Sequence, residues 1–390
     1  MNAEKTLLKH IPTLLSLWRG KTDTSALNKK ELKSVSNALL SLQRGLTGNR
    51  KLAGSGYMQN QDLLGAYLLY YWPVSYMQIS YAINSCPHDL PVFNQSTVTL
   101  LDVGSGPAPA SIAICDHLSS SNIESTDITL IDSSSKTLDL ARKIYNKAIP
   151  QAKTKVIQSD LQNGLPPITG QFDIIVLSHS LNELWKDKDN RIKLRADFLI
   201  QLSKHLKPDG ILLISEPALL ETSRNLIQVR DTLVQNGFKV LSPCLKSKIC
   251  PAVNSSQNQT CHAEIQWQPC EPVTSIARLC NLDRESVKMS FFIFSKSEFV
   301  PIQLQSNYYR IVSDGMLNKS GRIRYLLCDG EKRLPLSAKN GDVNAKQTGF
   351  FKLKRYDIVT VQSPEIRGDS QNPALGINEE TKLEISKFSV

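Results

Sequence analysis

Short runs of apolar residues alternate with longer amphipathic stretches through the middle of the chain. Five runs are too short for helices and are bounded by glycine or polar residues, which indicates buried strands of a parallel sheet. They lie at 98–103, 128–131, 156–160, 172–177 and 210–215. Runs at 238–242 and 287–296 are expected to add a sixth and a seventh strand. Helical spacing resumes between strands, as at 110–118 and 219–235, so the pattern predicts an α/β domain.

The two ends of the chain have other patterns. Helical spacing at 6–18 and 25–46 predicts N-terminal helices, and the aromatic-rich stretch 57–76 is expected to be helical on both sides of Pro73. The proline is expected to break or kink that helix near Trp72. Because Leu, Ala and Val are interleaved with its aromatic residues, we expect most of these to pack in the core rather than to stack on RNA.

Beyond residue 300, short runs separated by glycine-containing turns predict a small β domain, with an OB-like fold among the candidates. The expected strands cover 308–312, 322–327, 350–361 and 383–385, and the polar segment 363–375 is expected to be a loop. Five basic residues are expected on its surface: Arg322, Arg324, Lys352, Lys354 and Arg355. The expected domains are 1–94 (helical), 95–300 (core, with a Cys-rich insertion at 243–286) and 301–390 (β).

The first strand ends in a glycine-containing turn. Asp102 ends the apolar run, and Gly104 and Gly106 permit a tight turn that a residue with a Cβ would resist. The turn leads into a helix N-terminus, where free backbone N–H groups and the helix dipole can meet a polar ligand. The third small position of the motif is Ala108, and Pro109 disfavours the right-handed helical region there.

Acidic residues also end the next two strands. Asp132 can accept both hydroxyls of a ribose, and Asp160 suits the amino edge of adenine. These carboxylates would meet at the carboxyl edge of the sheet, where open α/β sheets bind ligands. The alternative is a sheet that kept its shape and lost its ligand; we favour binding.

This pattern resembles the Rossmann-like core of S-adenosylmethionine-dependent methyltransferases, with Asp102, Gly104 and Gly106 in the first motif and Asp132 in the second. The resemblance implies that the loop after the fourth strand faces the substrate beside the methyl group. His179, Asn182 and Glu183 in this loop are therefore candidate catalytic residues. Asn182 and Glu183 would equally suit the start of a helix.

Charge and composition narrow the partners. The net charge of +10 is concentrated at residues 1–52 and 306–355, each carrying +7. Two basic flanks favour nucleic acid, although solvated surfaces explain such charge as well. No apolar stretch reaches the ~20 residues of a membrane span, and no secretory signal is evident at residues 1–21. We expect an intracellular protein without a membrane partner.

Five of the eight cysteines lie within 37 residues, at 244–280. In an intracellular chain, metal binding or catalysis is a more common use of such a cluster than structural disulfides. Lys246 and Lys248 would offset the charge of bound thiolates. The spacing differs from that of zinc fingers, so an iron–sulfur cluster is preferred to zinc. Unliganded thiols are the remaining alternative. Cys86 and Cys115 lie in apolar surroundings and are expected in the core.

The chain further resembles small-ribosomal-subunit methyltransferase-like proteins, which include mitochondrial assembly factors and bacterial relatives. The resemblance covers about residues 57–339. It rests on AYLLYYWP (66–73), DVGSGP (102–107), SLNEL (180–184), YLLCDG (325–330) and the pairs at 243–244, 250–251 and 261–262. It implies a [4Fe–4S] cluster held by Cys244, Cys250, Cys261 and Cys328. Cys270 or Cys280 could replace Cys328, and zinc could replace iron.

Two functions follow from this resemblance. The first is an S-adenosylmethionine-dependent methyltransferase-like protein with an iron–sulfur cluster, acting on the small ribosomal subunit or its rRNA. The second is a catalytically inactive assembly factor that uses the fold to bind rRNA; the Ala108-Pro109 pair favours it. A small-molecule methyltransferase fits the two basic flanks less well. The expected location is the cytoplasm, or the mitochondrial matrix in a eukaryote.

Overall fold

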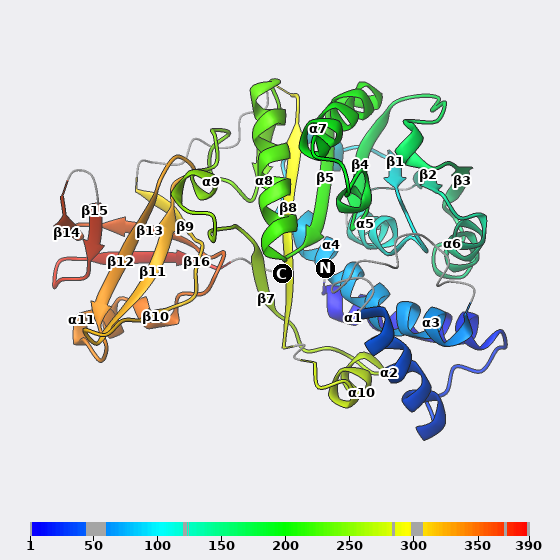
Figure 1. The fold of residues 1–390 in the computed structure, drawn as a ribbon, viewed down its shortest axis with the longest axis horizontal. Coiled ribbons are helices and arrows are strands. Elements are labelled where there is room, and N and C mark those ends of the chain that lie inside the picture. Colours follow the sequence, from blue (N-terminus) through cyan, green and yellow to red (C-terminus); the bar gives the residue numbers. More distant parts are fainter. Residues whose placement is uncertain are drawn as a thin grey trace.

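The computed structural model describes residues 2–43, 60–119, 123, 125–282, 285–297, 307–369 and 373–387. These residues form two eight-stranded sheets. Figure 1 shows the first sheet with helices on both faces and the second sheet standing to one side of it, next to α8 (Leu220–Gln235) and α9 (Pro251–Ser255). No helix among the described residues is both long and apolar enough to cross a membrane.

The first sheet has the strand order β3-β2-β1-β4-β5-β8-β6, and β7 pairs with β8. Its strands are β1 (Thr97–Val103), β2 (Ser125–Asp132), β3 (Lys153–Gln158), β4 (Phe172–Ser178), β5 (Leu206–Pro217), β6 (Lys239–Ser242), β7 (Ala263–Gln266) and β8 (Ser286–Ser295). Strands β1 to β5 pair in parallel, whereas β8 is antiparallel to β5 and β6. From β1 the chain adds β2 and β3 on one side of β1 and then returns to add β4 and β5 on the other side. The crevice between β1 and β4 is therefore a topological switch point, where such sheets bind ligands. The predicted Rossmann-like α/β class is confirmed.

The side chains of β1 alternate between two hydrophobic clusters, one on each face of the sheet. Val98 and Leu100 pack with α1 (Ala3–Arg19), α4 (Trp72–Asn84), α5 (Pro109–Ser119) and α6 (Ser135–Ala148). Leu101 and Val103 pack with α7 (Arg191–Leu202) and α8. Because both faces are covered, the central strands β1, β4 and β5 are mostly apolar and buried, which is why their runs stood out in the sequence.

The N-terminal helices cover one face of the sheet. Helix α2 (Lys29–Gln43) begins four residues later than expected, and residues 44–46 and 57–59 of the expected helices lie outside the described residues. The expected break at Pro73 is absent. Instead α3 (Gln61–Ala66) continues through a π-helical turn (Tyr67–Tyr71) into α4. The wider turn relieves the clash that a proline ring makes with the preceding helical turn.

Most of the aromatic residues in this helix are buried, as predicted. Tyr70, Trp72, Tyr76 and Tyr81 are at most 1% exposed. The Trp72 indole N–H donates to the Pro107 carbonyl at 3.0 Å. The aromatic helix therefore packs on the segment that follows the glycine turn.

The second sheet has the order β14-β15-β12-β11-β9-β13-β16, with β10 paired to β11. Its elements are β9 (Tyr308–Ile311), β10 (Met316–Leu317), β11 (Arg322–Cys328), β12 (Arg333–Lys339), α11 (Val343–Gln347), β13 (Ile358–Gln362), β14 (Glu365–Gly368), β15 (Pro373–Gly376) and β16 (Lys382–Ser386). The sheet curls around a core that includes Leu327, Leu336 and Phe350. A C-terminal β module was predicted, and the structure contains one.

Two expectations within this sheet were wrong. The segment expected to be a loop at 363–375 contains β14 and β15, which pair with each other, and β15 also pairs with β12. The first part of the strand expected at 350–361 is instead a 3₁₀ turn (Phe350–Lys352). Cross-strand partners from distant parts of the chain decide both cases, because strand formation depends on pairing more than on local preference.

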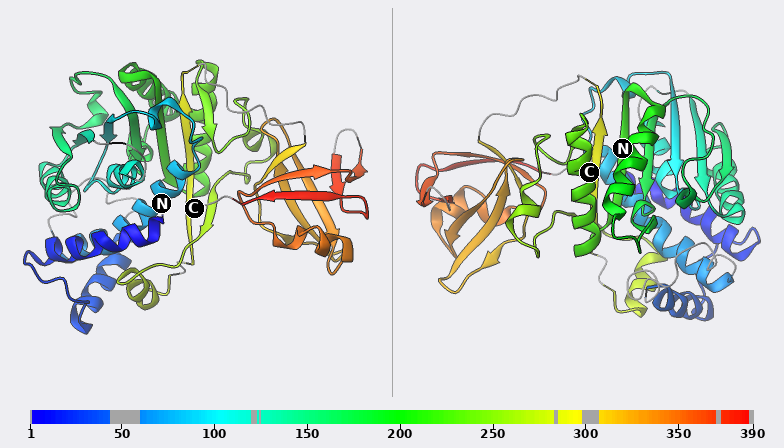
Figure 2. Two further views of the ribbon diagram at one scale, coloured as in Figure 1. Left: turned by 180° about the vertical axis from the view of Figure 1, so that it is seen from behind. Right: turned by 45° about the horizontal axis from the view of Figure 1, so that its top comes forward.

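Between β6 and β8 the chain leaves the core sheet and returns to it. It forms α9, then β7 on the edge of β8, then α10 (Val273–Leu279), which contacts α2. Both views in Figure 2 place the second sheet beside the α8–β8 side of the core. The excursion therefore lies between the core and the second sheet near α9, and against the N-terminal helices near α10.

Candidate functional site

The glycine turn after β1 is closed by hydrogen bonds to β2. Gly104, at φ 71°, donates its N–H to the Ile131 carbonyl at 2.8 Å. Gly106, at φ 54°, donates to the Asp132 carboxylate at 3.0 Å. A Cβ on Gly104 would lie 2.4 Å from the Cβ of Ser180, so the loop after β4 packs directly on the turn. Glycine is required here for both its conformation and its size.

Asp132 links the turn to the next helix. Its second oxygen accepts the N–H of Ser134, the N-cap of α6, at 2.9 Å. Burial raises the pKa of Asp132. Asp102 is 1% exposed and accepts from the Ser111 N–H at 3.2 Å, and its other oxygen has no hydrogen-bond partner among the described residues. Burial raises the pKa of Asp102 to about 7.

Ala108, the third small position of the motif, has a left-handed backbone conformation that is compatible with the proline after it. Ala108 adopts φ 61°, outside the region that Pro109 disfavours, and is fully buried. Tyr67, from the π-helical turn, places its hydroxyl oxygen 3.3 Å from where a Cβ on Gly106 would lie. Burial, followed by the charges of Asp132 and Asp102, raises the pKa of Tyr67. Tyr67 therefore borders the turn, although its aromatic surroundings in the sequence indicated only a core position.

Asp160 is separate from this arrangement. Strand β3 ends at Gln158, and Asp160 is exposed two residues later. Its carboxylate accepts the Gln162 N–H at 3.0 Å and so caps a 3₁₀ turn (Leu161–Asn163). The Asp160 carboxylate therefore makes a local capping contact, whereas the Asp132 carboxylate contacts Gly106.

The loop after β4 is held by contacts with β5 and α4. His179, at φ 56°, makes a 2.7 Å hydrogen bond through Nε2 to the Gln78 side chain, and burial lowers the pKa of His179 to about 4. The Asn182 backbone N–H donates to Glu216 at 3.1 Å, and its side-chain amide donates to the other Glu216 oxygen. Glu183 ends a 3₁₀ turn (Leu181–Glu183) and is half-buried.

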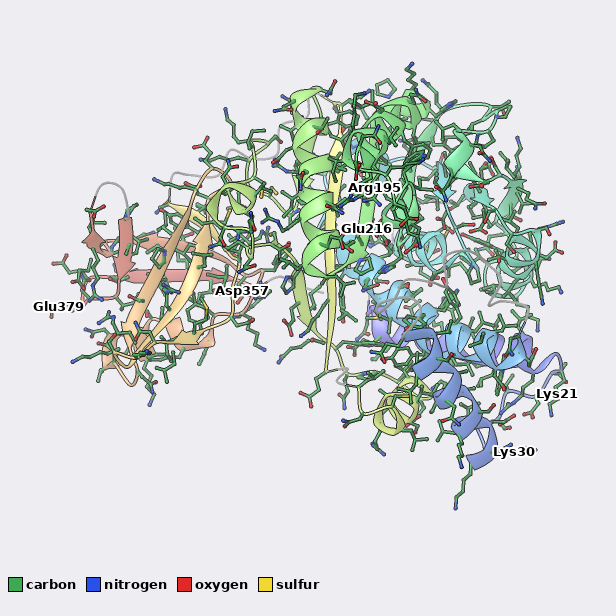
Figure 3. The ribbon with its side chains drawn as sticks, viewed as in Figure 1. Lys21, Lys30, Arg195, Glu216, Asp357 and Glu379 are labelled. Carbon is green, nitrogen blue, oxygen red and sulfur yellow. The ribbon has the colours of Figure 1, made fainter. Side chains whose placement is uncertain are left out.

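Glu216, near the end of β5, is a candidate residue that the sequence reasoning missed. It is 1% exposed, and burial raises its pKa to about 7. The buried Arg195 donates to the carbonyls of Asn182 and Leu184 at 2.6 and 2.9 Å. Figure 3 shows Arg195 and Glu216 close together in the core. An acidic residue at the end of a buried strand was the available signal.

Four cysteines line one cavity between the core and the second sheet. Cys244, Cys250 and Cys261 come from the excursion after β6, and Cys328 is the last residue of β11. Burial raises the pKa of the Cys244, Cys250 and Cys328 thiols, that of Cys328 to about 11. The Cys261 sulfur lies 3.4 Å from the hydroxyl of Tyr356.

Three arginines line the same cavity: Arg230, Arg310 and Arg333. Arg230 is 1% exposed; burial would lower its pKa, but Cys244 and Asp231 raise it above the usual range. Asp231 in turn accepts the Cys250 N–H at 3.0 Å. Arg333 donates to the Thr260 carbonyl at 3.2 Å. The positive charges of these arginines lower the pKa values of Cys244, Cys250 and Cys328, but burial outweighs them and the three pKa values stay raised.

The other two cysteines of the excursion lie elsewhere. The Cys280 thiol donates to the Ser36 carbonyl of α2 at 3.3 Å, and neither Cys270 nor Cys280 lines the cavity. Cys86 and Cys115 are 2% exposed and lie in the core, as expected. Within the described ranges, no three His, Cys, Asp or Glu side chains are arranged to hold a single metal ion.

Comparison with known protein families gives one match that covers most of the chain. Residues 62–343 match the family described as "Mitochondrial small ribosomal subunit Rsm22". The chain belongs to the Rsm22 family. The match spans the aromatic helix, the glycine turn, the loop after β4 and all four cavity cysteines, so the resemblance inferred from the sequence is confirmed. No curated protein matches the sequence.

Several solved structures are similar to this member of the Rsm22 family at low identity. A methyltransferase from Pyrococcus furiosus has 13% identity and a TM-score of 0.32, covering 52% of this chain and 77% of that one. The precorrin-6y C5,15-methyltransferase from Geobacter metallireducens has 14% identity and a TM-score of 0.32, covering 55% of this chain and 85% of that one. NSun6 from Pyrococcus horikoshii with SFG has 16% identity and a TM-score of 0.35, covering 57% of this chain and 51% of that one.

The raised pKa of Glu216 predicts a pH-dependent stability. The unfolded chain releases this proton near pH 4.3, whereas the folded protein holds it to about pH 7. The Glu216 contribution is therefore fully present at low pH and is lost as pH rises through about 7, at up to about 1.4 kcal/mol per pH unit. Urea unfolding at pH 5 to 8 should show a flatter profile for Glu216→Gln than for the unchanged protein.

The control for this measurement is Glu379→Gln, at an exposed position distant from Glu216 (Figure 3). It should reproduce the profile of the unchanged protein. Asp102 titrates in all three proteins, so the difference between profiles isolates Glu216. Identical profiles for Glu216→Gln and the unchanged protein would contradict the buried, protonated state.

Proposed function

We propose that this protein is an S-adenosylmethionine-dependent methyltransferase-like protein that acts on the small ribosomal subunit or its rRNA. The observation that carries the proposal is membership of the Rsm22 family over residues 62–343. The basic flanks support an RNA partner through phosphate attraction. Because the family is described as mitochondrial, we place the protein in the mitochondrial matrix of a eukaryote, or in the cytoplasm of a bacterium.

The residues around the glycine turn fit the methyl donor. The turn leads into the N-terminus of α5, and a Cβ on Gly106 would narrow the space between the turn and the Tyr67 hydroxyl. Asp132 would accept the ribose hydroxyls, and the buried oxygen of Asp102 that has no hydrogen-bond partner among the described residues would accept from a polar group of the ligand. When bound, S-adenosylmethionine supplies an electrophilic methyl group. Asp160, which caps a 3₁₀ turn with one oxygen and is exposed, is proposed to contact the amino edge of adenine.

The contacts of the candidate catalytic residues suit them to hold the loop after β4 in position rather than to transfer protons. His179 is neutral across the physiological range because burial lowers its pKa to about 4, and Gln78 holds its ring. Glu216 holds both the backbone and the side chain of Asn182. In a transferase these contacts would fix the loop against the methyl group, which supplies positioning. Glu183 would be the loop's remaining carboxylate.

A second function is a non-catalytic assembly factor with the same fold. Asn182 is committed to Glu216 and His179 to Gln78, so neither is poised as a free acid or base. The left-handed Ala108 before Pro109 is a further departure from the glycine motif. This function retains ligand binding and subunit association and lacks methyl transfer.

The four cavity cysteines are proposed to hold a [4Fe–4S] cluster. Such a cluster takes one thiolate per iron, so its ligands spread around a multi-atom core. A single zinc ion instead needs all ligands at about 2.3 Å from one point. Four thiols around one cavity supply the four thiolates that such a cluster requires. The arginines of the cavity would offset its negative charge.

We propose that the cluster joins two of the expected domains, the core at 95–300 with its insertion at 243–286 and the β module at 301–390, because its ligands come from these two parts and none comes from the helical residues 1–94. Contacts between the insertion and the β module already lie around the cavity. Arg333 reaches the Thr260 carbonyl, Lys246 pairs with Glu331 at 3.4 Å, and Tyr356 reaches Cys261. A ligand from Cys328 would add a covalent link to these weaker contacts.

Association with the small subunit is the direct test. The protein should sediment with purified small subunits at low salt and dissociate as salt rises, because phosphate contacts release counterions. Large subunits are the control. Sedimentation with neither subunit, or equally with both, would refute the proposed partner.

Cofactor binding is tested at Asp132. Replacing it with alanine removes a charged hydrogen-bond acceptor, which is worth about 1.5–3 kcal/mol, so the affinity for S-adenosylmethionine in calorimetry should fall by about 10- to 150-fold. Asp127→Ala, on the same strand β2 at the opposite end, is the matched control and should bind normally. The proposal fails if the unchanged protein gives no binding heat.

The cluster is tested by comparing Cys328→Ser with Cys270→Ser. Anaerobically purified protein should contain about four iron atoms and as many sulfides per chain. Cys328→Ser should lose most of this iron and become more susceptible to protease between the core and the β module. Cys270→Ser, outside the cavity, should keep both properties. Zinc in place of iron, or full iron content in Cys328→Ser, would overturn the assignment.

A further inference from the structure

A second cavity lies on the opposite side of the core from the cysteines. It is a groove of about 500 Å³ lined by residues of α1 and α6 and by Leu64 of α3. Four lysines line it: Lys21, Lys136, Lys143 and Lys147. Lys21 follows the C-terminal end of α1, where Figure 3 shows it at the surface. The other three lie on α6.

The spacing of the α6 residues forms a single stripe. Lys136, Leu140, Lys143 and Lys147 follow one another at intervals of four, three and four residues, which places them on one face of the helix. This stripe faces α1, because all four residues line the groove that the two helices share. The three α6 lysines are exposed. The helix therefore presents a row of cations about 16 Å long at 1.5 Å per residue.

These charges are poorly neutralised by the protein. Across the described ranges, no salt bridge joins Lys136, Lys143 or Lys147 to a carboxylate; Lys147 donates to the Ser16 hydroxyl at 2.9 Å. Lys21 pairs with Asp23 at the surface at 3.3 Å. Asp139 is the sole acidic residue among those that line the groove. Four lysines opposed by two carboxylates, Asp139 in the lining and Asp23 beside Lys21, leave an excess of positive charge that attracts a polyanion.

The groove also contains an unused hydroxyl. Thr137 is 2% exposed and lines the groove, and its Oγ1 has no hydrogen-bond partner among the described residues. A buried polar atom without a partner costs free energy that a ligand acceptor would recover. Leu17, Leu64 and Leu140 complete the lining with a small apolar area.

We propose that the groove between α1 and α6 binds the sugar–phosphate backbone of single-stranded RNA; this rests on the proposed rRNA partner. Lysines act as point charges for phosphates, and none of the lining residues is aromatic, so recognition does not depend on base stacking. Three leucines are too few for the row of anchors that an amphipathic peptide helix requires. The stripe begins four residues after Asp132, so RNA in the groove would pass close to the cofactor end of the sheet.

The test compares two charge-reversed proteins. Lys136→Glu with Lys143→Glu removes two cations from the groove, and Lys193→Glu with Lys239→Glu removes two exposed lysines outside it. Fluorescence anisotropy measures binding of a labelled 12-nucleotide oligouridylate at several salt concentrations. The groove variant should bind the RNA at least about tenfold more weakly. The slope of log K plotted against log salt concentration should also become shallower by about 1.4, because each of the two lost phosphate contacts contributes about 0.7 to it.

Unchanged circular dichroism and melting temperature establish that both variants are folded. Equal RNA affinity in the groove variant and the control would overturn the inference, as would displacement of the RNA by 12-residue polyglutamate at the same concentration. Failure of the unchanged protein to sediment with small subunits would refute the proposed function alone. Normal sedimentation together with an unaffected groove variant would refute the groove alone.

Discussion

The burial of cations beside thiols is the constraint on which the meeting of the two sheets depends. Arg230 and Arg310 are 1% and 8% exposed, and a buried guanidinium is costly unless anions or hydrogen-bond acceptors surround it. Backbone carbonyls and Asp231 supply part of that environment. Cys244 lies beside both guanidiniums in the same cavity, and burial raises the pKa of its thiol. The excursion after β6 and the end of β11 therefore have to approach each other closely for either set of groups to be stable.

The glycine turn imposes a similar constraint on the opposite end of the core sheet. Asp132 holds the Gly106 N–H with one oxygen and the cap of α6 with the other, so the turn and the helix that carries the lysine stripe share one carboxylate. Tyr67 and the loop at Ser180 close on the turn from two sides. The ligand crevice and the basic groove are thus consecutive features of one strand–helix connection.

Local pattern was sufficient for the core sheet and insufficient for the β module. The central strands β1, β4 and β5 are buried on both faces, so their apolar runs identified them without knowledge of their partners. The strands β14 and β15 are four residues long, and they exist because each pairs with the other and β15 also pairs with β12. The proline was expected to break or kink the helix near Trp72. The π-helical turn that carries the helix through Pro73 was not predicted, because such a turn has no distinctive sequence signal. Glu216 and Tyr67 escaped notice for a related reason: their importance lies in what they contact.

By itself, the sequence determined the class of the fold, the glycine turn, the residues that carry the family resemblance and the cysteines to consider. These properties depend on residues near one another in the chain, or on the regular spacing of apolar residues along a single helix or strand. Only the tertiary structure decided that Cys328 lines a cavity with Cys244, Cys250 and Cys261 while Cys270 and Cys280 do not. It also decided that lysines of α6 face α1 across a groove. Both results require the packing of segments far apart in sequence, which no local pattern encodes.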